Sequence, residues 1–247
     1  MMNSALDFRT LAKLAPLCAA FAVASCSSTS DKSSGGNPSS HTASKVKADD
    51  GRTVEIGKAS PSPGGGVNYK NPHMGKCWVA DGFDFNGYDT LYIAPTLSTA
   101  KFDPKNTEEF KVHELAKENL VKELVNMISA RKIFANVVTH DSDLKPEAKT
   151  LKLENTITEF SKGGGAARYF VGLYGGGQPV IRVQGRMAEG EKALFAFEAR
   201  RSGVSAGARM TGVLMKDQDI QLQDIHSLVL DLADFMSVIA GKYPRRP

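Results

Sequence analysis

The sequence predicts an α+β fold, in which a mixed sheet of about five strands carries two amphipathic helices on one face. Two stretches, one from about residue 106 to 132 and one near the C-terminus, repeat apolar residues at helical spacing. The stretches before and between them alternate apolar with polar residues, as half-buried strands do. The resulting order is β-α-β-β-β-β-α, which implies that both helices pack on the same side of the sheet.

The first strand and the first helix follow each other closely. Leu91 to Ala94 form the predicted strand, and Pro95 ends it because proline cannot donate to a neighbouring strand. Asn106 and Glu109 are typical of a helix start. The Asn106 side chain is expected to cap the helix backbone, and the Glu109 side chain is expected to reach back to Asn106. The helix that they begin carries a wide apolar stripe, which includes Val112, Ala116, Leu120, Leu124 and Ile128.

Four more strands are predicted, over residues 133–138, 151–160, 180–187 and 193–201. The last two form a hairpin, because the short polar turn at residues 189–191 joins them. Alternation along the second arm of this hairpin places Phe195, Phe197 and Ala199 on one face.

A second amphipathic helix follows the hairpin. Its apolar residues recur three or four positions apart and include Leu222, Ile225, Val229, Leu232, Met236 and Ile239. Gly241 is expected to cap this helix in a left-handed backbone conformation, and Pro244 prevents its extension. The helix therefore ends close to residue 240.

The first residues of the chain have the organisation of an export signal. Arg9 and Lys13 precede an apolar run over residues 14–24, which is too short to span a bilayer. The run leads into Val23-Ala24-Ser25-Cys26, which resembles the lipobox of bacterial lipoproteins. The resemblance implies a signal peptide over residues 1–25, cleavage in front of Cys26, and attachment of lipid, palmitate included, to the Cys26 thiol. An ordinary secretory signal that happens to contain a cysteine is the alternative.

The residue after the lipobox and the remaining cysteines bear on location. In bacterial lipoproteins an aspartate after the lipidated cysteine usually retains the product on the inner membrane, and here that residue is Ser27. The resemblance therefore implies the outer membrane, on its periplasmic side. Cys18 leaves with the signal and Cys26 receives lipid, so Cys77 is left alone. We expect Cys77 to be buried, with intermolecular pairing as the alternative.

Residues 26–76 are rich in Ser, Gly, Pro, Asn, Asp and Lys. Such a composition buries too little apolar surface to offset the entropy of folding, so the segment is predicted to be a disordered tether. A short ribbon that turns at Asp50 and Gly51, between Val46 and Val54, is compatible with part of it. Order is expected to begin near Trp78, which makes residues 77–247 the folded domain.

The centre of this domain resembles a known family. Its pattern is a strand that ends in glycine over residues 156–163, an arginine at Arg168, spaced glycines over residues 172–177, and an alternating strand over residues 180–183. These features are similar to those of the bacterial lipoprotein family known as domain of unknown function 4410, and the similarity extends loosely over residues 88–241.

Two positions depart from the pattern of that family. Tyr174 stands where a spaced glycine is expected, and residues 188–190 lack the aspartate that is usual before the turn. The family has no assigned activity. The resemblance therefore implies a location and a fold, and it adds no mechanism.

A glycine-bracketed segment is the strongest candidate for a contact surface. The runs Gly163-Gly164-Gly165 and Gly175-Gly176-Gly177 enclose a stretch that is apolar and aromatic apart from one arginine. One interpretation is a connection folded over its own sheet. The other is a surface that contacts a protein partner, a second copy or lipid, formed by Arg168, Tyr169, Phe170, Gly172 and Tyr174.

Several function classes are disfavoured. A net charge of +4 is too weak for a nucleic-acid-binding surface. Residues 203–207 match the G-x-S-x-G motif around Ser205, but no helix is predicted directly after the serine and His226 is the only later histidine. The histidines are scattered, with no ligand spacing. No catalytic residue, metal ligand or cofactor is therefore predicted.

These observations favour an outer-membrane-anchored periplasmic lipoprotein that acts as a non-enzymatic binding or assembly component of the cell envelope. Its expected partners are the membrane, through the lipid on Cys26, and an envelope protein or a second copy of the chain. A small-ligand or lipid-binding module is the alternative. A serine hydrolase that uses Ser205 is less favoured.

The lipobox generates the first testable prediction. Cys26→Ala is expected to leave the protein without lipid and soluble, because Cys26 carries the acyl-accepting thiol at the cleavage site. Membrane fractionation with labelled palmitate measures both effects, and Cys77→Ala serves as the control that keeps its lipid. Retention of the Cys26→Ala protein on membranes would contradict the anchor.

Overall fold

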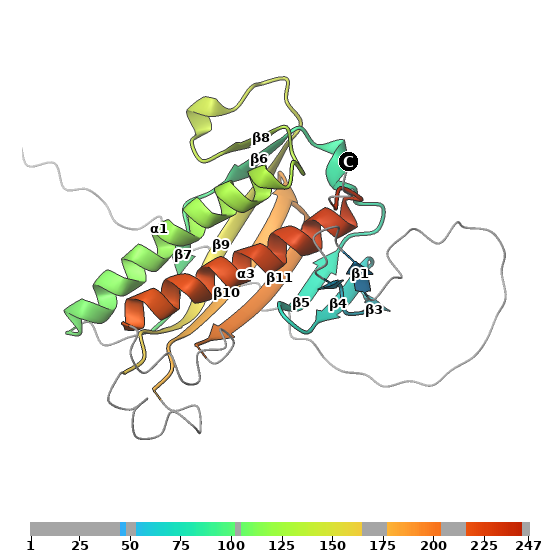
Figure 1. Ribbon diagram of the computed structural model, residues 1–247. Coiled ribbons are helices and arrows are strands. Elements are labelled where there is room, and N and C mark those ends of the chain that lie inside the picture. The colour runs from blue at the N-terminus through green and yellow to red at the C-terminus, as the bar shows by residue number, and fades with distance from the viewer. Residues whose placement is uncertain (1–44, 48–52, 102–104, 165–176, 204–215, 244–247) are drawn as a thin grey trace, which may run out of the picture. The chain divides into compact units, whose positions relative to one another are not determined.

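The computed structural model describes residues 45–47, 53–101, 105–164, 177–203 and 216–243. All of them belong to one compact unit, Pro38–Pro247. This unit has two layers, a mixed sheet of nine strands and two long helices that pack on one of its faces (Figure 1). The helices are α1 (Thr107–Ala130) and α3 (Asp217–Ile239). The predicted α+β class and the placement of both helices on one face are confirmed.

The strands of the large sheet lie in the order β3-β4-β5-β11-β10-β9-β6-β8, and β7 also pairs with β9. Pairing is antiparallel from β3 to β9 and parallel where β6 meets β8 and β9 and where β7 meets β9. Their bounds in spatial order are β3 (Lys58–Pro61), β4 (Val67–Asn71), β5 (Gly75–Val79), β11 (Lys192–Ser202), β10 (Val180–Glu189), β9 (Thr150–Ser161), β6 (Thr90–Ile93), β8 (Asn136–Val138) and β7 (Leu97–Ser98).

The predicted number of about five strands is too low. The additional strands are β3, β4, β5 and β7, which are short and lie in segments dominated by turn-forming residues. A two-stranded sheet of β1 (Lys45–Lys47) and β2 (Thr53–Glu55) and two single turns of 3-10 helix, η2 (Phe85–Gly87) and η3 (Asp141–Asp143), complete the described elements.

The expectation that residues 26–76 form a disordered tether is wrong for residues 45–47 and 53–76, which form strands and their turns. Tyr69 of β4 is only 2% exposed and its ring meets that of Phe235 edge-on, with centroids 5.4 Å apart. Asn71 accepts hydrogen bonds from the backbone of His73 and of Met74, both at 2.8 Å, which closes the turn into β5. The turn residues thus connect strands that are too short to show a periodic pattern.

The local sequence signals are confirmed where the structure describes them. Val46 pairs with Val54, as expected for the short ribbon. Asn106 caps α1 by accepting from the Glu109 backbone at 3.1 Å, and its own amide donates to the Glu109 carboxylate at 3.2 Å. Gly241 ends α3 with φ +64°, a conformation that favours glycine.

The predicted strand over residues 133–138 is shorter than expected. Only Asn136–Val138 pair as β8, because Ile133 and Phe134 are buried in the core directly after α1. The strand predicted to reach Phe160 is confirmed as β9, and the predicted hairpin is confirmed as β10 and β11.

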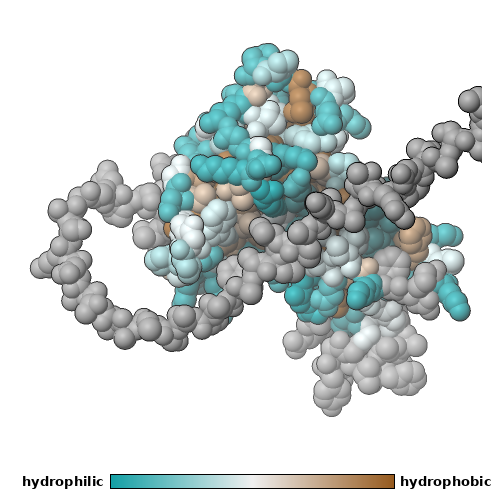
Figure 2. Space-filling view, turned by 180° about the vertical axis from the view of Figure 1, so that it is seen from behind, coloured by the Kyte–Doolittle hydropathy of each residue, from teal (hydrophilic) through white to brown (hydrophobic). Residues whose placement is uncertain are grey.

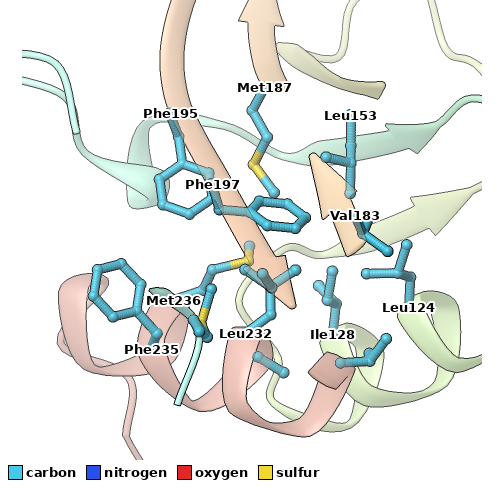
Figure 3. Packing of buried hydrophobic residues seen from close by; sticks show 14 of the residues in the cluster. Leu124, Ile128, Leu153, Val183, Met187, Phe195, Phe197, Leu232, Phe235 and Met236 are labelled. Carbon is cyan, nitrogen blue, oxygen red and sulfur yellow. The ribbon is translucent and has the colours of Figure 1, made fainter. Parts of the chain in front are cut away.

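The core lies between the sheet and the helices, and side chains of both layers point into it (Figure 3). Phe195, Phe197 and Ala199 share one face of β11, as predicted, and this face meets α3. Gly185 makes room for one of them, because a Cβ at this position would lie 2.1 Å from the Phe197 ring. The helices contribute Leu124, Ile128, Leu232, Phe235 and Met236.

Two arginines link α3 to its surroundings. Arg201 at the end of β11 forms an ion pair with Asp231 and donates to the carbonyl of His73. Arg131 at the end of α1 forms an ion pair with Asp234. Since these groups are largely buried, removal of one partner would leave a poorly solvated charge. The pairs therefore define how α3 lies against its neighbours.

The corrected start of the folded domain generates the second prediction. Tyr69→Ala is expected to lower the free energy of unfolding by about 3 kcal/mol or more, because it removes a buried ring that packs on Phe235. Urea unfolding measures the change, and Ser60→Ala, at an exposed position of β3, serves as the control. If Tyr69→Ala left the free energy of unfolding unchanged, this segment would have to be interpreted as a tether after all.

Candidate functional site

The structure leaves one face of the large sheet without a described helix, and we call it the open face. Both α1 and α3 cover the opposite face (Figure 1). Side chains on β9, β10 and β11 alternate between buried apolar residues toward the helices and charged residues on the open face. Seen from behind, the described residues there are largely hydrophilic (Figure 2). The open face is the first candidate surface for binding.

Cross-strand ion pairs occupy the middle of the open face. The Arg182 side chain lies 3.1 Å from the carboxylate of Glu159 and 3.4 Å from that of Glu198, so one arginine bridges β9 and β11. Arg200 reaches Glu159 as well, at 3.2 Å, and its hydrogen bond holds the pKa of Glu159 below the ordinary value. These half-exposed pairs contribute at most about 1 kcal/mol each. The charges in the middle of the face thus satisfy one another.

A second candidate surface lies where β9 ends and β10 begins. The Gly164 N–H donates to the Gly177 carbonyl at 2.9 Å, which closes the base of the connection between the two strands. Gly163 adopts φ +77°, and a Cβ there would lie 2.6 Å from the Gly177 carbonyl oxygen. Gly177 has φ +72°, so both glycines adopt a backbone conformation that other residues rarely adopt.

Two of the described large hydrophobic side chains are exposed, Leu97 on β7 at 65% and Phe110 in the first turn of α1 at 50%. Lys162, which follows β9, pairs with Glu108 at 2.5 Å and so brings the start of α1, with Phe110, to the same end as the glycine base. Leu97 lies opposite Thr156 in the middle of β9 and belongs to another part of the surface. We call the surface formed by Phe110 and the glycine base the contact end.

The residues predicted from sequence to form the site lie outside the described ranges. This applies to Arg168, Tyr169, Phe170, Gly172 and Tyr174, to the lipidation site Cys26 and to Ser205 of the G-x-S-x-G motif. The contact surface, the anchor and the absence of catalysis therefore stay predictions. The structure places only the base of the predicted contact segment.

Sequence analysis missed a Ser–His–Glu arrangement. His113 Nε2 lies 2.9 Å from Ser98 Oγ, and His113 Nδ1 lies 3.2 Å from the Glu114 carboxylate. Burial lowers the pKa of His113, so the ring is neutral at pH 7. The Ser98 hydroxyl also accepts from the Ala100 backbone and lies 3.3 Å from the Ile157 carbonyl. These contacts hold β7 against α1 and β9. The sequence did not predict the arrangement, because Ser98 and His113 are too far apart in the chain to form a local pattern.

Cys77 is buried, as predicted. It is 2% exposed on β5, and burial raises the pKa of its thiol to about 12, so the thiolate needed for nucleophilic or metal chemistry is strongly disfavoured. Within the described ranges, no cluster of three or more His, Cys, Asp or Glu residues is placed to hold a metal ion.

A hollow of about 440 Å³ lies near the C-terminal ends of both helices. It is lined by Ser129, Lys132, Phe134, Ala135, Val137 and Lys242. The Lys242 ammonium donates to the Ile133 carbonyl at 2.8 Å, so this lysine helps to close the end of α1.

Neither α1 nor α3, nor any shorter helix that the structure describes, combines the length and apolar character of a membrane-spanning helix.

A family model described as "Domain of unknown function (DUF4410)" matches residues 44–207. The chain belongs to the DUF4410 family. The resemblance inferred from the glycine pattern is thereby confirmed. The match starts directly before β1, which agrees with the corrected start of the folded region, and it ends before α3.

Solved structures with a similar arrangement include the PelC dodecamer from Paraburkholderia phytofirmans and protein XCC0632 from Xanthomonas campestris, which is described by the family model DUF330. The PelC chain is 12% identical with a TM-score of 0.40, over 64% of this chain and 98% of that one. XCC0632 is 11% identical with a TM-score of 0.30, over 62% and 85%. Comparison with curated proteins finds no match. At these values the similarities carry no argument about function.

Asp224 is an unusual buried residue of this DUF4410 chain. It is 1% exposed on α3, and neither carboxylate oxygen has a hydrogen-bond partner in the described part of the protein. Burial raises the pKa of Asp224 to about 6, and the nearby Arg201 opposes this shift only in part. An ionised Asp224 therefore destabilises the folded state at neutral pH.

The third prediction follows from this pKa. Because the folded value of about 6 exceeds the ordinary 3.8, the unfolded chain releases the Asp224 proton first as the pH rises. The free energy of unfolding should thus fall between about pH 4 and pH 6, by up to about 3 kcal/mol, and stay low above that range.

Asp224→Asn is therefore expected to raise the free energy of unfolding at about pH 7.5 and to leave it nearly unchanged at about pH 4. Urea unfolding at both pH values measures the two effects. Asp219→Asn, at an exposed position of the same helix, is the control. Equal effects of Asp224→Asn at both pH values would contradict the raised pKa.

Proposed function

We propose that this DUF4410 chain is a non-enzymatic binding or assembly component of the bacterial cell envelope, anchored by lipid on Cys26 to the periplasmic face of the outer membrane. The lipobox resemblance of Val23-Ala24-Ser25-Cys26 supports the anchor and the compartment. The partner in this proposal is an envelope protein or a second copy of the chain, bound at the contact end.

The exposure of Phe110 at the same end as the glycine base carries the proposal. Removing a large apolar side chain from water is favourable by roughly 25 cal/mol per Å², so its exposure favours a partner. The sequence between the two glycine runs adds Phe170 and Tyr174 to the same connection. Aromatic residues of this kind are enriched at protein interfaces because they supply large contact areas.

The contact end generates the fourth prediction. A photo-crosslinking amino acid at position 110, introduced in the intact lipidated protein, is expected to form a discrete adduct with an envelope protein or with a second copy. The same amino acid at position 122, exposed further along α1, is expected to form none. Mass spectrometry of the adduct distinguishes the two partners. Equal crosslinking at both positions, or none at position 110, would overturn the proposal.

A double substitution separates contact from folding. Phe170→Ser with Tyr174→Ser is expected to abolish the adduct at position 110 and to leave the melting temperature nearly unchanged. If it instead removes several kcal/mol of stability, as loss of packed aromatic rings does, the segment belongs to the core.

A further inference from the structure

Three lysines form a straight row across the edge of the open face. Lys58 of β3 lies directly opposite Lys70 of β4, and Lys70 lies directly opposite Lys76 of β5. Their neighbours Tyr69 and Cys77 are buried toward the helices, so alternation places the lysines on the open face. All three lysines are exposed.

The row differs from the charged residues in the middle of the same face. Arg182 and Arg200 also lie opposite each other, but both bind the carboxylate of Glu159. Lys58, Lys70 and Lys76 have no ion pair in the described part of the protein, although Glu198 lies opposite Lys76 on β11. That carboxylate instead interacts with Arg182 and Gln184, each at 3.4 Å.

Like charges at directly opposed positions of an antiparallel sheet destabilise it. The row therefore lowers the stability of the edge of the sheet and gains nothing from intramolecular pairing. An anionic partner laid along the row would reverse this effect, because each of its charges would meet an ammonium group.

The adjacent row of the open face holds the single tryptophan of the chain. Trp78 lies opposite Asn68 of β4, which lies opposite Ser60 of β3. The Trp78 indole donates to the Gly65 carbonyl at 2.9 Å, which fixes the ring, and Ala196 on its other side leaves space beside it. A partly exposed aromatic ring and two hydrogen-bonding side chains thus accompany the lysines.

We propose that Lys58, Lys70, Lys76 and Trp78 form a binding site for an acidic polysaccharide that lies across β3, β4 and β5. Neighbouring strands are about 4.8 Å apart, and this spacing is close to the repeat of single sugar units in an extended chain. Successive carboxylate or sulfate groups therefore meet successive lysines. The ring of Trp78 and the polar groups of Asn68 and Ser60 suit the apolar face and the hydroxyls of a sugar.

The composition of the surface favours a glycan over a membrane. Surfaces that insert into lipid headgroups combine cations with several large apolar side chains, whereas the row beside the lysines has one, Trp78, next to the polar Ser60 and Asn68 and the small Ala196. The site is also separate from the contact end, because β3 to β5 lie on one side of β11 and β7 and β9 lie on the other. It therefore does not depend on the proposed protein contact.

Titration of the intact protein with an oligogalacturonate, followed by the fluorescence of Trp78 and by calorimetry, tests the site. Binding is expected at low salt, with a change in tryptophan emission, and it should weaken strongly from about 0.05 M to about 0.5 M salt. Replacement of Lys58, Lys70 and Lys76 by glutamine is expected to weaken binding at least about tenfold. The control replaces Lys111, Lys122 and Lys145, which are exposed elsewhere, and should bind as the unaltered protein does.

The competing outcomes are distinct. Neutral dextran should not bind, and polyglutamate and vesicles with anionic lipid should bind much more weakly than oligogalacturonate. Equal binding of polyglutamate or of vesicles would overturn the proposal of a glycan site. So would no binding of oligogalacturonate, or equal losses in the two triple variants.

Stability gives a second readout for the same row. Lys70→Gln removes the central charge, so it is expected to raise the melting temperature at low salt, with a smaller rise at high salt, while it weakens oligogalacturonate binding. Lys122→Gln should change neither property. A Lys70→Gln protein that is less stable would show that the lysine supports the fold, and the repulsion on which the proposal rests would be absent.

Discussion

Helix α3 carries apolar residues on most of its sides, and the need to cover it organises the rest of the molecule. Leu228, Val229, Leu232 and Phe235 are all fully buried. One sheet face cannot cover so wide an apolar surface, so α1 packs alongside and β2 approaches as well. This arrangement uses one face of the sheet completely for the core and leaves the other face to solvent or to a partner.

The two proposed surfaces follow from this one-sided architecture. In the middle of the open face, charges from three adjacent strands pair with one another, as on the solvated side of many antiparallel sheets. At the edge of the face, no described residue compensates the charges of the lysine row of β3 to β5 in this way. The contact end lies elsewhere, where the exposed Phe110 is at the same end as the base of a glycine-bracketed connection. A cationic surface and an apolar surface thus suit two different kinds of partner.

Local signals predicted much of the central fold, because they depend on neighbours in the sequence. The cap at Asn106, the end of α3 at Gly241 and the alternation in β9 to β11 all have this character. The short strands β3 and β4 could not be predicted in the same way, since residues such as Ser60, Pro61 and Gly65 indicate flexible chain by composition. Their order comes from pairing with β5, and from the burial of Tyr69 against Phe235, a residue far along the chain.

By itself the sequence determined the α+β class, both helices, the central hairpin, membership of the DUF4410 family and the glycine base of the contact segment, because periodicity, caps and glycine spacing are local properties. Only the tertiary structure decided that the ordered sheet reaches back to β3 and that Ser98 meets His113. It also decided that Lys58, Lys70 and Lys76 stand in one row. Strand register aligns residues that the sequence separates, and composition does not encode that register.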